Sequence, residues 1–292
     1  MKAYIFPGQG SQFRGMGFEL YSNNLNAKKL FKLANNILEF DICKIMFSGS
    51  DEELKQTNVT QPAIFIYSTI LAQCMNDFKP DMVAGHSLGE FSALVAAKVL
   101  SFPEGLMLVK SRAEAMQIAC EKSESTMAAI IGLEANIIEE ICEKEIGVVV
   151  PANYNAPGQI VISGEIQAVQ TTCNKLSKIG AKRTLILPVS GAFHSPLMQI
   201  AKSTLKKKID SIEFKKPICP IYQNVCAQAI TNEEVLKNNL IQQLTTPVKW
   251  YQTIEAMFQE GAEQFIEVGP GNVLTGLNRR INREINSIKA SI

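Results

Sequence analysis

A glycine-flanked serine at residues 85–89 constrains this chain more than any other feature. The five residues read Gly-His-Ser-Leu-Gly, between a short, mostly apolar run at 81–84 and a small-residue apolar segment at 91–97. The pattern predicts a buried strand that turns sharply into a helix, with Ser87 at the bend and glycines that permit close backbone approach. Such an elbow exposes a serine hydroxyl at a helix N-terminus. We therefore expect an α/β protein that handles acyl groups.

Composition narrows the class of protein. The chain has 292 residues, of which 46% are hydrophobic, and a net charge of +1. This length allows one large domain with an insert, and the near-neutral charge argues against nucleic acid as a partner. No apolar run approaches the roughly 18 residues that span a bilayer, and Pro7 and Gly8 interrupt the N-terminal strand too early for a secretory signal. We expect a cytoplasmic protein with no membrane partner.

The cysteines predict neither disulfides nor a metal site. Their number is odd, and no two have the Cys-X-X-Cys spacing. Scattered thiols of this kind are typical of a reducing compartment. The seven are Cys43, Cys74, Cys120, Cys142, Cys173, Cys219 and Cys226.

The two ends of the chain show the alternation of strands and helices of an α/β domain. Strand 3–6 leads into a glycine-rich loop at 7–11, and a buried helix is expected to start at Pro62. Ser101 and Glu104 have the spacing of a capping box, which predicts a helix at 102–121. The later elements expected are a helix at 196–209, a strand at 218–224, a helix at 233–244, a strand at 264–268 and a helix at 273–281.

The middle of the chain has a different order of elements. Strand 127–133, helix 136–143, strands 148–152 and 159–163, helix 166–179 and strand 183–187 give the order βαββαβ. This is the order of the ferredoxin-like unit. We predict a large α/β catalytic domain with a mainly parallel sheet at 1–122 and 191–292, and an inserted small ferredoxin-like subdomain at 123–190.

Only two histidines are available to activate Ser87. A serine hydroxyl needs a base to take its proton, and histidine is the usual one. His86 adjoins Ser87 at a strand end, where its side chain should point the other way. We therefore assign His194, which lies where the small subdomain rejoins the large domain, as the general base.

A tetrahedral oxyanion at Ser87 needs two backbone donors. The amide of Leu88, the residue after the nucleophile, supplies one. The second must come from a nearby loop, and Gln9, in the glycine-rich loop after the first strand, is the natural candidate. Taken alone, this short loop indicates no more than a tight turn.

Four motifs together resemble a known family. Residues 6–12 read Phe-Pro-Gly-Gln-Gly-Ser-Gln, residues 85–90 Gly-His-Ser-Leu-Gly-Glu, residues 191–194 Gly-Ala-Phe-His and residues 267–271 Glu-Val-Gly-Pro-Gly. Their order and spacing resemble the malonyl-CoA:acyl carrier protein transacylases of type II fatty-acid synthesis, across essentially the whole chain. Residues 153–159, Asn-Tyr-Asn-Ala-Pro-Gly-Gln, look like that family's subdomain hairpin.

The resemblance assigns roles to particular residues. It implies that Ser87 takes the malonyl group, that His194 is the base and that the amides of Gln9 and Leu88 form the oxyanion hole. It also implies that Arg112 binds the free malonyl carboxylate, a role that suits a planar guanidinium with two parallel donors. In the family no carboxylate completes a triad, and a backbone carbonyl near Gln243 orients the histidine.

Acyl selectivity is predicted from two neighbours of the site. Phe193, beside the base, should crowd an α-methyl branch, so we expect malonyl to be preferred over methylmalonyl. The steric difference is worth roughly 1–3 kcal/mol. Met116, one helical turn after Arg112, is a further candidate for the acyl pocket.

The resemblance also implies the partners, which are malonyl-CoA and an acidic acyl carrier protein. A basic docking surface is therefore expected, and two clusters qualify. We expect a monomer that needs no metal or redox cofactor. The clusters are Lys175, Lys178, Lys182 and Arg183 in the small subdomain, and Lys202, Lys206, Lys207 and Lys208 after the base.

The expected mechanism is ping-pong transfer through a malonyl-serine ester. Two alternatives remain open. A serine hydrolase, either a thioesterase or a lipase, would use the same elbow with water as acceptor, although Arg112 argues against a lipase. The second alternative is a non-catalytic scaffold of a synthase complex. The presence of Ser87, His194 and Arg112 argues against it. The pathway served, fatty-acid or polyketide synthesis, is also open.

Overall fold

Six strands form the larger of two sheets in the computed structural model, which describes residues 1–189 and 191–291. Their order is β10-β9-β1-β2-β7-β8, and every neighbouring pair is parallel except β7 with β8. The mainly parallel sheet is therefore confirmed. The strands are β1 (Lys2–Phe6), β2 (Met82–Gly85), β7 (Ile221–Gln223), β8 (Gln228–Ile230), β9 (Gln264–Glu267) and β10 (Asn286–Lys289).

Both faces of this sheet are covered by helices, as expected for a parallel sheet. Alternate residues of β1 enter two different cores. Tyr4 and Phe6 pack into the large core with helices α5, α6 and α7, whereas Ala3 and Ile5 pack against α12 and α13. The helices outside the small unit are α1 (Phe18–Asn23), α2 (Leu25–Leu38), α3 (Ile42–Ser48), α4 (Asp51–Lys55), α5 (Thr57–Cys74), α6 (Gly89–Ala96), α7 (Phe102–Lys122), α10 (Gln199–Asp210), α11 (Glu233–Gln242), α12 (Trp250–Gln259) and α13 (Val273–Ile281).

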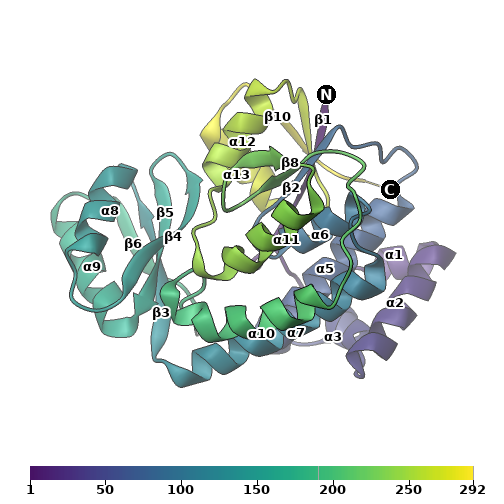
Figure 1. Cartoon of the computed structure of the whole chain (residues 1–292), viewed down its shortest axis with the longest axis horizontal. Helices are drawn as coiled ribbons and strands as arrows, with labels where there is room; N and C mark the ends of the chain where they lie inside the picture. The colour runs from purple at the N-terminus through teal and green to yellow at the C-terminus, as the bar shows by residue number, and fades with distance from the viewer. Residues whose placement is uncertain (190, 292) are drawn as a thin grey trace.

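The second sheet belongs to a small unit beside the first, drawn in teal at the left of Figure 1. It is antiparallel with the order β4-β5-β3-β6, and α8 and α9 pack their apolar faces on one side of it. This arrangement confirms the ferredoxin-like prediction. Its elements are β3 (Ser125–Ile131), α8 (Ala135–Glu143), β4 (Val149–Ala156), β5 (Gln159–Glu165), α9 (Ile166–Lys178) and β6 (Arg183–Ile186).

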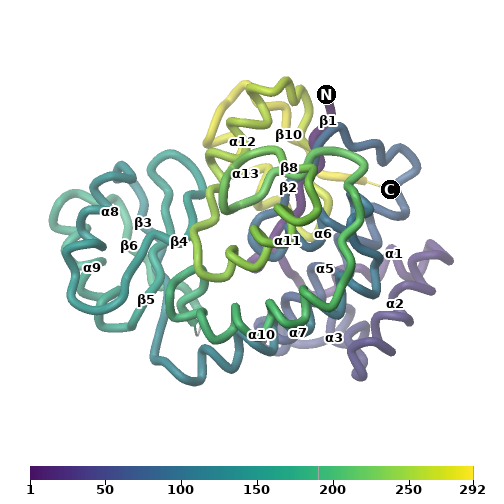
Figure 2. The backbone as a smooth tube through the Cα atoms, viewed as in Figure 1, coloured from purple at the N-terminus to yellow at the C-terminus, as the bar shows by residue number. Residues whose placement is uncertain are grey.

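The chain enters the small unit from α7 and leaves it toward α10, so both connections lie at the same end, as the tube in Figure 2 shows. The boundary predicted at 122/123 follows the last residue of α7, and the one predicted at 190/191 involves residue 190, which lies outside the described residues. Asn153 forms a parallel bridge with Val248, which joins the β4–β5 hairpin to the segment between η2 and α12 in the large domain.

Several predicted bounds were wrong. Helix α5 begins at Thr57 rather than at Pro62, which lies inside it; the packing of this largely buried helix offsets the hydrogen bond that Pro62 cannot donate. The strand predicted at 148–152 continues to Ala156, which shortens the hairpin turn to 157–158. The helix predicted at 196–209 begins as the 3-10 turn η1 (Pro196–Met198), and the one at 233–244 ends in another, η2 (Gln243–Thr245).

Two absences concern the described residues only. No helix among them has the length and apolar character to cross a membrane. Within residues 1–189 and 191–291, no three His, Cys, Asp or Glu side chains are grouped so that they could hold a metal ion.

Candidate active site

The serine elbow is formed by close backbone packing between β2 and α6. A Cβ added to Gly85 would lie 1.9 Å from the carbonyl carbon of Gly89, and one added to Gly89 would lie 2.0 Å from the oxygen of Phe6. Only glycine fits at either position. Between them Ser87 has a φ of 51°, in the left-handed region that a residue with a side chain rarely adopts. The strained bend holds the hydroxyl at the start of α6.

His194 lies against the nucleophile. Its Nε2 is 2.8 Å from Ser87 Oγ, and its Nδ1 is 2.8 Å from the main-chain oxygen of Gln243. Because a carbonyl can only accept, Nδ1 carries the hydrogen and Nε2 is left to accept the serine proton. Among the described residues, Arg112 and His86 contribute the charge effects at this imidazole, and its Nδ1 is bonded to a carbonyl rather than a carboxylate.

The electrostatic surroundings keep His194 neutral. Burial, and after it the nearby Arg112 cation, lower the pKa of its imidazole to about 3. The hydrogen bond to Gln243 acts in the opposite direction. A neutral imidazole can accept a proton from Ser87. The Arg112 cation lowers the pKa of His194 most when no negative charge lies beside the arginine to offset it.

His86 faces away from the nucleophile, which confirms the prediction made from its place at a strand end. Its Nε2 is 2.8 Å from Oδ1 of Asn155 in the small unit, and its ring lies 5.4 Å from that of Trp250. Burial lowers the pKa of this imidazole as well.

The two amides predicted for the oxyanion hole lie in the segments that follow two adjacent strands, β1 and β2. β1 and β2 are parallel neighbours, and the His86 amide donates to Phe6 O at 2.9 Å, so the loop that carries Gln9 passes beside the elbow. Leu88 is the N-cap residue of α6, where backbone N–H groups have no helical partner. Within the described part of the chain, neither amide is bonded to another backbone group.

Arg112 is a buried cation aimed at the nucleophile. It comes from the middle of α7, and its side chain is 1% exposed. Nη2 donates to Ser87 Oγ at 3.1 Å and to Gln243 Oε1 at 3.4 Å, while Nη1 donates to Gln61 Oε1 at 2.5 Å. Burial lowers the pKa of the guanidinium to about 10, and Glu90 opposes that shift. The arginine is charged at neutral pH and lies within reach of an acyl group on Ser87.

Three buried polar residues of this site were not predicted. Gln61 holds Arg112, Asn224 accepts from the Ser87 amide at 2.7 Å, and Glu90 accepts from Gln243. A glutamate at the start of an otherwise apolar, small-residue helix was a signal that could have identified Glu90, since a charge is rarely buried without partners. Nothing in the local sequence distinguishes Asn224.

The two selectivity candidates lie in different surroundings. Met116 is fully buried, and its Sδ accepts from Gln61 Nε2 at 3.4 Å, which places it behind the residue that holds Arg112. Phe193 is buried in the large core beside the base. Its proposed effect on branched acyl groups stays a prediction.

The predicted basic clusters are partly paired. In the small unit, Lys175 lies 2.8 Å from Glu145. On α10, Lys206 lies 2.5 Å from Asp210, and Lys202 donates to Thr245 Oγ1 at 3.3 Å. Thr245 belongs to η2, the turn that also carries Gln243, so the α10 cluster is the one adjacent to the site.

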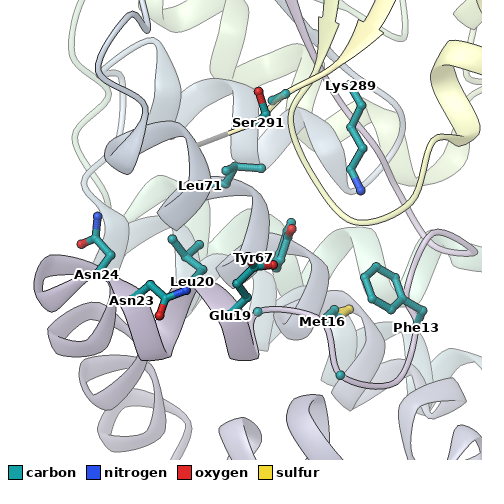
Figure 3. A pocket seen from close by; sticks show the side chains of 13 residues that line it. Phe13, Met16, Glu19, Leu20, Asn23, Asn24, Tyr67, Leu71, Lys289 and Ser291 are labelled. Atoms are coloured by element: carbon teal, nitrogen blue, oxygen red, sulfur yellow. The ribbon is translucent and has the colours of Figure 1, made fainter.

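A separate cavity of about 520 Å³ is lined by none of the residues at the nucleophile. It lies between α1, α5 and the end of the chain after β10. Figure 3 shows Leu20 and Leu71 on one side of it, with Phe13 and Lys289 on the other.

Comparisons with known proteins agree on one family. A family model described as an acyl transferase domain matches residues 3–290. The chain is 41% identical over 286 residues to the malonyl CoA-acyl carrier protein transacylase of Staphylococcus aureus strain MRSA252, a match over 97% of this chain and 93% of the relative. The solved acyl-carrier-protein-S-malonyltransferase of Bartonella henselae has a TM-score of 0.96 and 40% identity, with 100% of this chain and 95% of that one covered.

A second solved structure contains a partner. It is a malonyl-transacylase in complex with a type II PKS acyl-carrier protein, with a TM-score of 0.95 and 37% identity over 99% of this chain and 95% of that one.

Proposed function

The chain belongs to the acyl transferase family, within its malonyl CoA-acyl carrier protein transacylases, and we propose that it works in two half-reactions through an ester on Ser87. The enzyme transfers malonyl from malonyl-CoA to an acyl carrier protein, which supplies fatty-acid or polyketide synthesis. One observation carries the proposed mechanism: Ser87 Oγ lies 2.8 Å from the base His194 and 3.1 Å from the cation Arg112.

In the first half-reaction His194 Nε2 takes the proton of Ser87, and Oγ attacks the thioester carbon of malonyl-CoA. The oxygen of the tetrahedral intermediate becomes negative and is bound by the amides of Gln9 and Leu88. The carbon–sulfur bond then breaks, the imidazolium returns its proton to sulfur, and CoA leaves as a thiol. Malonyl remains as an ester on Ser87.

Arg112 selects an acyl group that ends in an acid. Its Nη2 donates to Ser87 Oγ in the free enzyme. An ester oxygen is a poorer acceptor, so acylation frees this donor for the malonyl carboxylate. A charge-assisted pair in a buried site is stronger than one in water. The carboxylate also offsets the cation that lowers the pKa of His194, which makes the imidazole a better base when the correct acyl group is bound.

In the second half-reaction the phosphopantetheine thiol of the carrier protein gives its proton to His194 and attacks the ester carbon. The carbon–oxygen bond to Ser87 breaks, and Oγ recovers the proton from the imidazolium. One thioester has replaced another, so the reaction is freely reversible and is proposed to need neither a metal nor a redox cofactor.

The cellular setting is part of the same proposal. All seven cysteines are unpaired, among the residues that the structure describes. Unpaired thiols support a reducing compartment, and we place the enzyme in the cytoplasm as a monomer.

The decisive test is the intact mass of the protein after mixing with malonyl-CoA. Wild-type enzyme should gain one malonyl group and lose it when a holo acyl carrier protein is added. Ser87→Ala should gain none. Rapid release of free malonate without carrier protein would favour a hydrolase, and absence of any label on wild-type protein would favour a non-catalytic scaffold.

The same assay measures acyl selectivity. If Phe193 crowds an α-methyl branch, methylmalonyl-CoA should load roughly 10- to 100-fold more slowly than malonyl-CoA. Equal loading rates would contradict the role proposed for this ring.

A further inference from the structure

Glu90 is a buried acid that the proposed chemistry does not use. It lies in the first turn of α6, three residues after the nucleophile, and is fully buried. Its Oε1 accepts from Gln223 Nε2 at 2.9 Å, and its Oε2 accepts from Gln243 Nε2 at 2.5 Å and from the Asn224 amide at 3.4 Å. Because every partner is an N–H donor, Glu90 acts here as an acceptor only.

Gln243 connects Glu90 to both functional side chains of the site. Its Nε2 donates to Glu90 and, at 2.9 Å, to the main-chain oxygen of Ser87. Its Oε1 therefore faces Arg112, whose Nη2 donates to it at 3.4 Å, and its main-chain oxygen holds His194. A reversed amide would oppose an NH2 group to the guanidinium, donor against donor.

Asn224 extends the same network to the elbow. Its main-chain N–H donates to Glu90. Its side-chain Oδ1 accepts from the main-chain N–H of Ser87 at 2.7 Å, and its Nδ2 donates to Gly85 O at 2.6 Å. The Glu90 carboxylate thus lies between Asn224, which holds the backbone of Ser87, and Gln243, which faces Arg112.

We propose that Glu90 is a positioning residue for acyl selectivity: it fixes the orientation of the Gln243 amide, which in turn aims Arg112 at the acyl group on Ser87. This inference rests on the proposed function, because the direction of Arg112 matters only for an acyl group that carries an acid. Glu90 touches no reacting atom and acts through Gln243.

Glu90 has a second possible route to Arg112, through charge. Burial raises the pKa of Glu90 to about 7, while its donors and Arg112 lower it, and Glu90 in turn raises the pKa of Arg112. A direct charge effect does not depend on Gln243, whereas positioning does. Substitutions at the two residues therefore separate the routes.

The first experiment measures kcat and KM for loading of Ser87 from malonyl-CoA and from acetyl-CoA. Glu90→Gln keeps the size of the side chain but replaces one oxygen with an NH2 group, so the side chain can no longer accept from both Gln223 and Gln243 and holds the Gln243 amide less firmly. Malonyl kcat/KM is expected to fall about 10- to 100-fold, mainly through KM, and acetyl kcat/KM by less than about 3-fold.

Glu267→Gln is the matched control. Glu267 is also a fully buried glutamate, and it ends β9 in the six-stranded sheet, where it accepts from the main-chain amides of Leu274 and Thr275 at 3.0 and 2.8 Å. In the part of the chain that the structure describes, its hydrogen bonds go to Leu274 and Thr275 and none goes to Gln243. Its substitution is expected to lower the melting temperature without changing the ratio of malonyl to acetyl loading, which separates selectivity from general destabilisation.

The second experiment uses Gln243→Met, which removes the amide and keeps the main-chain carbonyl that holds His194. This variant should show the same selective loss as Glu90→Gln, and it provides the test if Glu90→Gln does not fold. In the double variant the loss should be no larger than the greater single loss, because both changes break one connection. Losses that multiply would show a direct charge effect and overturn the positioning role.

The remaining outcomes are also decisive. If Glu90→Gln slows malonyl and acetyl loading equally, or changes neither, the proposal is wrong. Wild-type protein that takes no malonyl on Ser87 contradicts the proposed function itself. Wild-type protein that is malonylated normally, together with unchanged selectivity in Glu90→Gln, contradicts only the role of Glu90.

Discussion

The two histidines lie beside the same nucleophile but bond to different parts of the molecule. His86, in the elbow, is joined through Nε2 to Asn155 of the small unit. His194, in the segment after β6, is joined through Nε2 to Ser87 and through Nδ1 to the Gln243 carbonyl. Burial lowers the pKa of both imidazoles, so burial does not distinguish the base from its neighbour.

The difference lies in which ring nitrogen meets an oxygen that can only accept. An amide or main-chain oxygen requires N–H opposite it. In His86 that oxygen faces Nε2, which leaves this nitrogen a donor. In His194 it faces Nδ1, which leaves Nε2 free to accept the proton of Ser87. His86, although next to Ser87 in sequence, is thus excluded as the base by its bond to Asn155. His194, although distant in sequence, is made the base by its bond to Gln243.

The largest expected effect tests this assignment directly. His194→Ala should slow malonyl loading of Ser87 by about 10³- to 10⁴-fold, because the hydroxyl then has no base. His86→Ala should slow it by less than about 10-fold. Initial rates by intact mass give both values, and a larger loss in His86→Ala than in His194→Ala would reverse the comparison.

Arg112→Ala should have the next largest effect. Malonyl kcat/KM is expected to fall about 100-fold relative to acetyl, because the carboxylate loses a buried, charge-assisted partner. Arg112→Lys should recover only part of the loss, since an ammonium lacks the planar pair of donors. Competition between malonyl-CoA and acetyl-CoA for one sample of enzyme measures the ratio, and an unchanged ratio would remove Arg112 from substrate recognition.

The sequence predicted the parts of the site that are local in the chain. The elbow at Ser87, the loop of Gln9 and the βαββαβ order each follow from spacing over a few residues, and backbone sterics then determine the conformation. Adjacent parallel strands place the two loops together, which is why Gln9 could be placed near Ser87.

The partners of the site were beyond sequence reasoning because they are set by packing between distant elements. Asn224 reaches the Ser87 amide from 137 residues away, and Gln61 reaches Arg112 across 51. The β8 and β10 strands were also missed: β8 has only three residues, and β10 only four. Strands β2, β7 and β9 are equally short but buried and largely apolar, whereas β8 and β10 are edge strands whose residues are mostly exposed, so no apolar run identifies them.

A smaller effect concerns stability and pH. His194 stays neutral in the folded protein because its pKa is lowered to about 3, whereas an unfolded imidazole titrates near 6.5. The folded state therefore binds fewer protons below about pH 6.5, and the stability contributed by neutral His194 is complete above that pH and decreases as pH falls. Between about pH 6.5 and 5, wild type should lose about 2 kcal/mol relative to His194→Gln.

The quantity to follow is the difference in free energy of unfolding between wild type and His194→Gln at each pH. Glu90, whose pKa burial raises to about 7, contributes a pH dependence of opposite sign over the same range in both proteins. Urea unfolding at several pH values gives the free energies. A wild-type-minus-variant difference that does not change with pH would show that His194 becomes protonated in the folded state.

The smallest expected effect is that of Asn155→Ala on activity. The substitution leaves His86 Nε2 without its partner, which should cost about 1–3 kcal/mol of stability. The β4–β5 hairpin remains attached through main-chain bonds, from Tyr154 N to Val248 O at 2.9 Å and from Val248 N to Ala152 O at 2.8 Å. The nucleophile and base should therefore keep their geometry, and malonyl loading should change by less than about 3-fold at a temperature where the variant is folded.

This variant also separates a structural histidine from a reactive one. If His86 only joins the elbow to the small unit, Asn155→Ala should lower the melting temperature while the pH dependence of loading stays that of wild type. If instead His86 supplies a proton or a base, freeing its Nε2 would change that pH dependence and slow loading by about 100-fold or more. That result would show that both histidines, despite their opposite partners, act on Ser87.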